Sequence, residues 1–173
     1  MNTSNLTSRP EHAQGDPARQ FLRHTIATLA YRGGKALRGA PDSFAEFRIG
    51  ESTRTPAQIL AHIGDLLDWA LSLAMGKQAW HDSAPLPWAD GVGRFFAALT
   101  DLDAYLASGS TLGGPPEKIF QGPIADALTH IGQISMLRRL AGSPVRGENY
   151  LRAAIAAGKV GAEQLPPKAE LDA

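Results

Sequence analysis

Two polar residues one helical turn apart, Asp126 and His130, have the types and spacing best suited to chemistry. Residues four apart on an α-helix share a face, with Cβ atoms about 6 Å apart, so two such side chains can reach one ion. Gln133 follows three residues later, where its amide could orient a ligand or a bound water. His62 lies in another helical stretch and could supply a third ligand from a facing helix. The sequence therefore predicts a metal site inside a helical bundle, formed by His62, Asp126 and His130.

This ligand set indicates which ions would suit the site. Two imidazoles and one carboxylate favour a borderline divalent ion such as Zn²⁺, Ni²⁺ or Fe²⁺. Three protein ligands leave coordination positions open for water or substrate, which is typical of catalytic rather than structural sites. We assign the three residues to metal binding alone, and no residue to a catalytic role or to binding an organic cofactor.

A simpler interpretation needs no metal. A histidine on an apolar helix face is commonly a hydrogen-bonded core residue, and Asp126 could merely accept the N–H of His130 across one turn. The loop histidine His81 lies near Trp80 and Trp88. Loops of this kind can line a site, although packing beneath the loop is the commoner reason for such aromatic residues. The alternative function is then a non-catalytic bundle that binds a small ligand or a partner.

Other charged residues near these motifs have mainly structural interpretations. Asp65 and Asp68 follow His62 on its helix and favour a solvated face, although Asp65 could be an outer partner of His62. Arg138 and Arg139 close the last long helix. We expect them to be exposed cations favoured by the C-terminal helix dipole, although they could reach an anionic substrate.

The elements that would position these residues are helices, because apolar residues recur at spacings of three and four. Thr55-Pro56-Ala57-Gln58 combines an N-cap, a proline at N1 and a capping-box glutamine. Gly33-Gly34 interrupts the first helical pattern, where it could permit close packing or cause a kink. The expected helices run from about 16 to 39, 55 to 76, 90 to 107 and 122 to 140, followed by a short fifth helix over 148–157. The apolar spacing within these segments predicts an all-α protein, a four-helix bundle with a short additional C-terminal helix.

Length and composition limit the remaining choices. The chain has 173 residues, of which 17 are basic, 17 acidic and none cysteine. The balanced charge argues against a nucleic-acid partner. The lack of any long apolar run argues against a membrane span, so we expect a cytoplasmic protein. We expect residues 1–15 to form a loose tail, 16–157 the bundle and 158–173 an extended or mobile tail.

The segments RTPAQILAHIGDLLDWAL (54–71) and DALTHIGQISMLRRLAG (126–142) resemble the DinB / YfiT-like superfamily of helical-bundle metalloenzymes, which includes mycothiol-dependent maleylpyruvate isomerases. The family pattern has a histidine on the second helix and a late His-x-x-x-His pair followed by Gly-Gln. His62 matches the first histidine, and His130 with Gly132-Gln133 matches the last. Asp126 departs from the pattern, because it stands where the family has a histidine.

The resemblance implies an up-down-down-up bundle, frequent homodimers and a divalent metal at His62, Asp126 and His130. Characterised members use a low-molecular-weight thiol as cosubstrate, and the metal would stabilise its thiolate or polarise a substrate carbonyl. The function that follows is a metal-dependent, thiol-dependent transferase or hydrolase acting on a small molecule. The substitution at Asp126 changes the charge of the site and could leave it degenerate.

Overall fold

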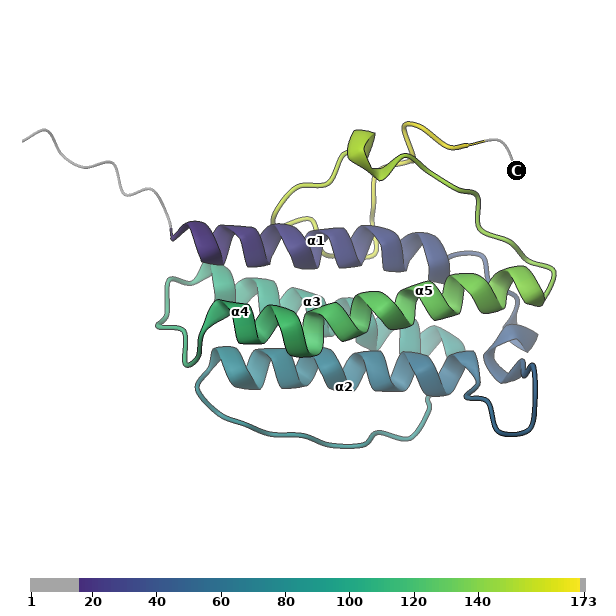
Figure 1. Cartoon of the computed structure of the whole chain (residues 1–173), viewed down its shortest axis with the longest axis horizontal. Coiled ribbons are helices and arrows are strands. Elements are labelled where there is room, and N and C mark those ends of the chain that lie inside the picture. Colours follow the sequence, from purple (N-terminus) through teal and green to yellow (C-terminus); the bar gives the residue numbers. More distant parts are fainter. Residues whose placement is uncertain (1–15, 172–173) are drawn as a thin grey trace, which may run out of the picture.

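The computed structural model describes residues 16–171, which form an all-α structure of long helices packed side by side (Figure 1). The all-α class predicted from the sequence is confirmed, and within the described range the only strand-like pairing is one isolated bridge between Glu148 and Glu170. The elements are α1 (Pro17–Leu37), η1 (Asp42–Glu46), α2 (Pro56–Ala74), α3 (Trp88–Ala107), α4 (Pro116–Ile119), η2 (Phe120–Ile124), α5 (Ala125–Leu140) and η3 (Tyr150–Arg152).

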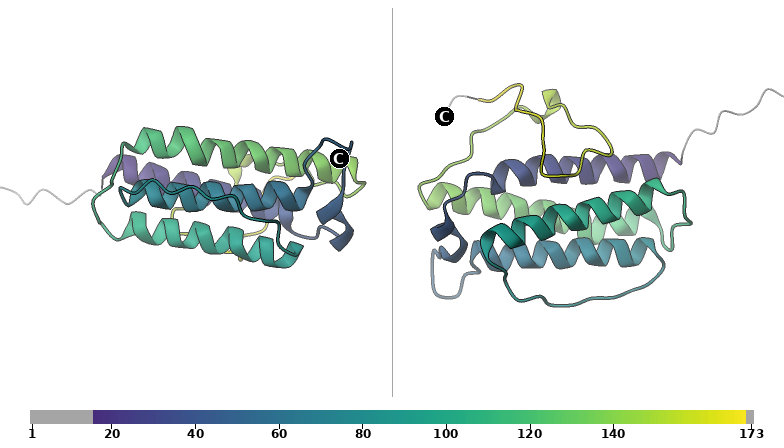
Figure 2. Two further views of the ribbon diagram at one scale, coloured as in Figure 1. Left: turned by 90° about the horizontal axis from the view of Figure 1, so that it is seen from below. Right: turned by 180° about the vertical axis from the view of Figure 1, so that it is seen from behind.

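Side-chain contacts define how the helices run relative to one another. Arg94, early in α3, donates to the carbonyl of Ala61 in the first half of α2, so these two helices run in the same direction. Arg23, early in α1, pairs with Asp103 near the end of α3, so α1 runs the opposite way. The connection over 75–87 must therefore return along the length of the bundle, as Figures 1 and 2 show.

The helix starts follow from local sequence signals. Asp16 caps α1 by accepting from the N–H of Ala18, and a proline occupies the first turn. Thr55 and Gln58 form the expected capping box of α2, with both reciprocal hydrogen bonds present. The third helix begins at Trp88, two residues before the expected Asp90.

Gly33 permits close packing of α1 against α3 and does not break the helix. The helix continues to Leu37, and the ring of Phe95 lies against the Gly33 backbone. A Cβ atom at this position would lie 2.5 Å from Phe95 Cζ and 3.3 Å from Ile131 Cδ1, closer than van der Waals contact allows. Of the two interpretations of Gly33-Gly34, close packing is the one that the structure supports.

Gly33→Ala is therefore expected to destabilise the protein by about 1–3 kcal/mol, as overpacking of a core does. This outcome opposes the intrinsic helix preference, which favours alanine over glycine by about 1 kcal/mol. Gly93→Ala is the matched control, because a Cβ on Gly93 of α3 meets no atom within 4 Å. Urea unfolding should show that Gly93→Ala is neutral or stabilising. A stabilised Gly33→Ala variant would contradict the packing argument.

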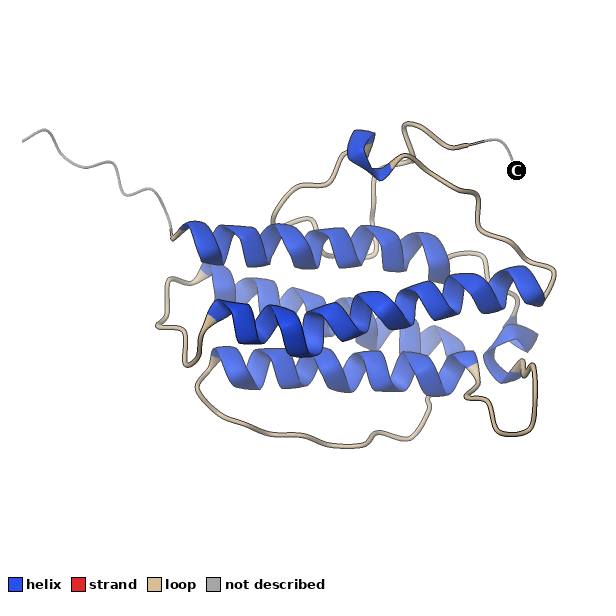
Figure 3. Ribbon diagram, viewed as in Figure 1, coloured by secondary structure: helices blue, strands red, loops and turns tan. Residues whose placement is uncertain are grey.

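The fourth long helix begins earlier than the sequence indicated and contains a wide turn. We expected a start at Gly122-Pro123, but the helical path begins at Pro116 and passes through the π-helical segment η2 before α5 (Figure 3). Proline inside an α-helix lacks an N–H and clashes with the carbonyl four residues earlier. A π-turn at Pro123 relieves this conflict, and such turns often occur beside functional sites. The segment ends directly before the first turn of α5, where Asp126 lies.

The predicted fifth helix over 148–157 is wrong, because only the single 3₁₀ turn η3 forms there. Glu148 is buried, where it accepts from the Tyr31 hydroxyl and pairs with Lys35 of α1. Lys35 also pairs with Glu170, so the segment after α5 crosses α1 and returns to it in extended form (Figure 2). These long-range contacts compete with local helix formation, and the described part of the C-terminal segment is held against α1.

None of the described helices combines the length needed to cross a lipid bilayer with sufficient apolar character.

Candidate metal centre

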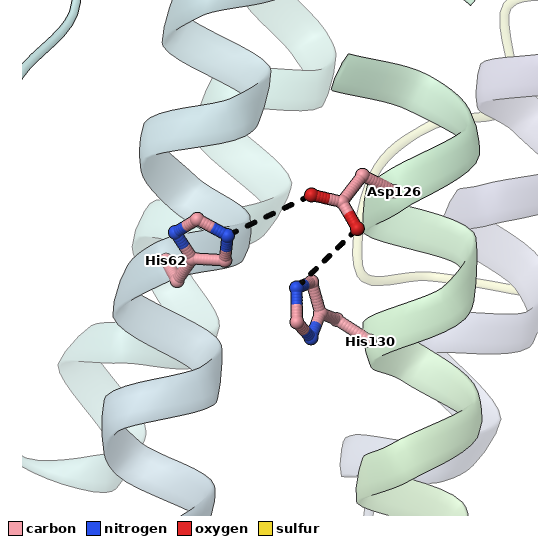
Figure 4. A group of neighbouring side chains, drawn as sticks. All are labelled: His62, Asp126 and His130. Atoms are coloured by element: carbon pink, nitrogen blue, oxygen red, sulfur yellow. Dashed lines mark ion pairs between the residues drawn. The ribbon is translucent and has the colours of Figure 1, made fainter. Parts of the chain in front are cut away.

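The structure brings His62, Asp126 and His130 together between α2 and α5 (Figure 4). Asp126 lies between the two imidazoles: its Oδ2 is 3.8 Å from His62 Nε2, and its Oδ1 is 3.5 Å from His130 Nε2. The two rings meet edge to face, with centroids 4.8 Å apart. One ligand atom from each residue lies within 4.8 Å of the others, so the group could hold a metal ion.

These separations fit an ion better than a set of direct hydrogen bonds. Donor and acceptor atoms in a good hydrogen bond lie about 2.7–3.2 Å apart, and the contacts of Asp126 are longer. In a tetrahedral zinc site, bonds of about 2.0–2.2 Å place neighbouring ligand atoms roughly 3.4 Å apart. The observed 3.5 and 3.8 Å separations are close to that spacing, but they run to the two different oxygens of Asp126, so binding through one oxygen would need the carboxylate to rotate. The arrangement can therefore act as a three-ligand site with open positions.

The site lies in a surface groove, which corrects the expectation of a site inside the bundle. The side chains of His62, Asp126 and His130 are 22%, 48% and 12% exposed. Leu140, which lines the same groove as His130, is 52% exposed. An adjacent face of α5, formed by Ala127, Ile131 and Ile134, packs into the core. Both faces have spacings of three and four, so periodicity alone selected the wrong one.

Gln133 determines which nitrogen of His130 is available. Its Oε1 lies 2.8 Å from His130 Nδ1, and an amide oxygen can only accept a hydrogen bond. In the neutral ring this contact places the proton on Nδ1 and leaves the lone pair on Nε2, the nitrogen on the side of Asp126. This is the outer contact that metal-binding histidines commonly make, and it agrees with the orienting role expected for Gln133.

The surroundings of His62 favour its neutral form. Its pKa is lowered from 6.5 mainly because the ring is partly buried, and electrostatic repulsion from His130 and Arg54 adds to this effect against the attraction of Asp126 and Asp65. Trp80 packs edge to face on His62 at 5.7 Å and on Trp69 at 5.8 Å. The loop containing Trp80 therefore lies beside the site. A neutral imidazole is the form that binds metals.

The other tryptophan of that loop has a packing role. Trp88 lies edge to face against the buried Phe44, with ring centroids 5.4 Å apart. Of the two explanations left open for these aromatic residues, a place beside the site applies to Trp80 and packing applies to Trp88.

A second cluster with ligand-like spacing, formed by Asp65, Asp68 and His81, already contains a cation. Arg94 Nη2 lies 2.7 Å from a carboxylate oxygen of each aspartate. His81 Nε2 adds contacts of 3.1 Å to Asp68 and 3.4 Å to Asp65. Since the guanidinium already occupies the space between the two carboxylates, this group acts as an ion-pair network that fastens the 77–87 loop to α2.

Asp65 is buried in this network, which corrects both roles considered for it from the sequence. Its other oxygen accepts from the Ser83 N–H at 2.9 Å. Sequence reasoning missed Arg94 as its partner. The available signal was Gly64, where a Cβ would lie 2.8 Å from the Arg94 guanidinium, so the glycine admits Arg94 to the surface of α2.

The network makes a testable contribution to stability as a function of pH. Burial alone would raise the pKa of Asp65, but the hydrogen bonds from Ser83 and the ion pair with Arg94 outweigh burial and hold this pKa below 3.8. A carboxyl whose pKa is lowered by folding adds stability that is present above its unfolded pKa and lost as pH falls through the folded one.

Asp65→Asn is therefore expected to cost about 2 kcal/mol of unfolding free energy near pH 7, because it leaves Arg94 partly unpaired. The difference from wild type should shrink as the pH falls below 3.8, where wild-type Asp65 also loses its charge. Urea denaturation of wild type and variant between pH 7 and pH 3 measures the loss of stability at neutral pH and its decrease in acid. A difference that stays constant in acid would show that charge is not the source of the effect.

Two hollows adjoin the candidate metal centre. One, of about 420 Å³, is lined by His130 and Gln133 together with mainly apolar residues of α2, α5 and the segment before α2. The other, of about 260 Å³, is more polar and includes His62, Asp65 and Ser83 in its lining. Arg54 lines both.

Comparisons of the chain with protein family models, curated proteins and solved structures found no match.

Proposed function

We propose that this protein binds a divalent transition metal through His62, Asp126 and His130, and uses it in a transferase or hydrolase reaction on a small molecule. We further propose that the chain is a divergent DinB / YfiT-like protein in which Asp126 replaces one histidine of the family site. The observation that carries the proposal is the convergence of three ligand atoms within 4.8 Å of one another from two helices. The contact between Gln133 and His130 Nδ1 supports it, because it leaves Nε2 free to bind.

The chemistry follows from the ligands and their exposure. A divalent ion held there would supply Lewis-acid activation of a carbonyl or stabilise the thiolate of an external thiol cosubstrate. The chain's own residues would hold Nε2 of each imidazole and one carboxylate oxygen toward a common centre. Asp126 is half exposed, and His130 lines the groove from which a small molecule could approach the site.

Metal titration of protein purified without a histidine tag tests the proposal. After removal of metals by chelation, calorimetry with Zn²⁺, Ni²⁺ and Mn²⁺ is expected to show one site per chain, with Zn²⁺ or Ni²⁺ preferred over Mn²⁺ for imidazole ligands. The affinity should fall as the pH drops through the lowered pKa of His62, because protons compete for its nitrogen. Binding of less than about 0.2 ion per chain, without any thermal shift, would contradict the proposal.

A non-catalytic ligand-binding bundle is the second candidate function. The groove of about 420 Å³ favours it, because that volume is typical of small-molecule sites and requires no ion. The two candidates differ in their response to metal. A ligand-binding bundle should bind its ligand equally well with and without Zn²⁺ and should show no turnover with added thiols.

A further inference from the structure

Arg54 occupies a position from which it can select the ligand. It lies directly before Thr55, the N-cap of α2, and this cap holds the adjacent backbone with reciprocal hydrogen bonds. Its side chain is exposed and borders both hollows at the candidate metal centre. Within residues 16–171 no carboxylate or carbonyl oxygen pairs with Arg54, in contrast to Arg94 and Arg138. Its guanidinium is therefore available to a ligand.

The larger hollow, which Arg54 borders, has an apolar wall. Ile49, Met136 and Leu140 are exposed by about half or more of their area, and all three line this hollow. Ile59 and Leu137 form its buried part. Exposed apolar side chains gathered at one concave surface are a sign of a binding site.

The charges around the hollow favour an anion. Its lining contains no acidic residue, and Arg54 is its only permanently charged side chain. A divalent ion at the candidate metal centre would be only partly neutralised by the single carboxylate of Asp126, so it would add a net positive charge. A ligand with one anionic group and one apolar group would match both the charge and the wall.

We propose that the ligand of this groove is an amphipathic carboxylate, with its headgroup on Arg54 beside the metal centre and its apolar tail along Met136 and Leu140. Its conversion at the metal depends on the proposed function, whereas the binding does not require an ion. A bidentate contact between guanidinium and carboxylate fixes the headgroup, and the wall selects for a tail of several carbons.

Ligand-detected NMR titration of the full chain in chelator tests this selection, with octanoate as the probe. Octanoate is expected to bind saturably. Because 1-octanol lacks the charge and acetate lacks the tail, both should bind at least tenfold more weakly than octanoate. Arg54→Gln should weaken octanoate binding at least tenfold, and Arg152→Gln, at an exposed arginine outside both linings, should leave it unchanged. Met136→Gln should weaken it several-fold, with Met75→Gln as the exposed control.

Equal binding of octanol and octanoate would overturn the inference, as would an Arg54→Gln variant that behaves like Arg152→Gln. The same variants are then titrated with Zn²⁺. Arg54→Gln should keep full metal binding, because Arg54 is not among the ligands. If Zn²⁺ fails to bind, the proposed function fails, and the octanoate series in chelator still decides whether the groove selects amphipathic carboxylates.

Discussion

His130→Ala is expected to weaken Zn²⁺ binding by more than about 100-fold. Loss of an outer partner of a metal ligand already costs about 10–100-fold in affinity, and loss of a ligand itself should cost more. His130 is the best-placed ligand, because Gln133 fixes its ring and directs Nε2 toward the centre. Calorimetry on chelator-treated protein measures the change directly.

The control for this prediction is His24→Ala, at an exposed histidine on α1. It removes an imidazole that could bind Zn²⁺ adventitiously, and it should leave the affinity unchanged. Asp126→Asn keeps the shape of the side chain but removes the anionic ligand, so it should also weaken binding by at least tenfold. Asp126 is half exposed and His130 lines an open hollow, so neither replacement should prevent folding, which circular dichroism can verify. Equal affinities in His130→Ala and His24→Ala would contradict the proposed site.

Arg138→Ala should be the most destabilising of the substitutions considered. Arg138 is only 5% exposed, which corrects the expectation of an exposed cation at the end of the helix. Its guanidinium donates to the carbonyl oxygens of Ala36, Arg38 and Gly39 at the end of α1, and to Ser143 after α5. It therefore joins the C-terminal ends of two helices, whose carbonyls and dipoles favour a cation.

The expected loss is about 3–5 kcal/mol of unfolding free energy, because one buried and three partly buried carbonyls lose a charged donor together. Burial lowers the pKa of Arg138, but the group stays charged at any ordinary pH. Arg138→Lys should recover less than half of the loss, since an ammonium cannot span the same set of acceptors.

Arg139→Ala is the internal control for this prediction. Arg139 is the exposed neighbour of Arg138, and its replacement should change stability by no more than about 0.5 kcal/mol. Urea denaturation of the three variants gives the comparison. Similar midpoints for Arg138→Ala and Arg139→Ala would show that the carbonyl contacts contribute little to stability.

The sequence by itself determined the features that depend on neighbouring residues. The all-α class, the start of α1 at Asp16-Pro17 and the capping box of α2 follow from interactions within one turn. The candidate ligands His62, Asp126 and His130 could also be named in advance, because helical spacing relates two of them and a second helical stretch offers the third.

Only the tertiary structure decided where those residues lie. The polar stripe of α5 lines an open groove, since the adjacent face through Ala127, Ile131 and Ile134 fills the core better. Burial depends on which helices become neighbours, and two faces of one helix can share the same spacing. The burial of Arg138 was not foreseen for the same reason, since it depends on the end of α1 lying beside the end of α5.

Long-range pairing also replaced the predicted fifth helix with an extended segment. Glu148 is more than a hundred residues from Tyr31 and Lys35 in the chain, and no local pattern indicates that they meet. Arg94 reaches Asp65 only because Gly64 leaves room on α2. Local signals thus determine which helices form and which residues could bind a metal. Contacts between distant segments determine that the candidate metal centre is open to a groove and that Arg54 lies beside it.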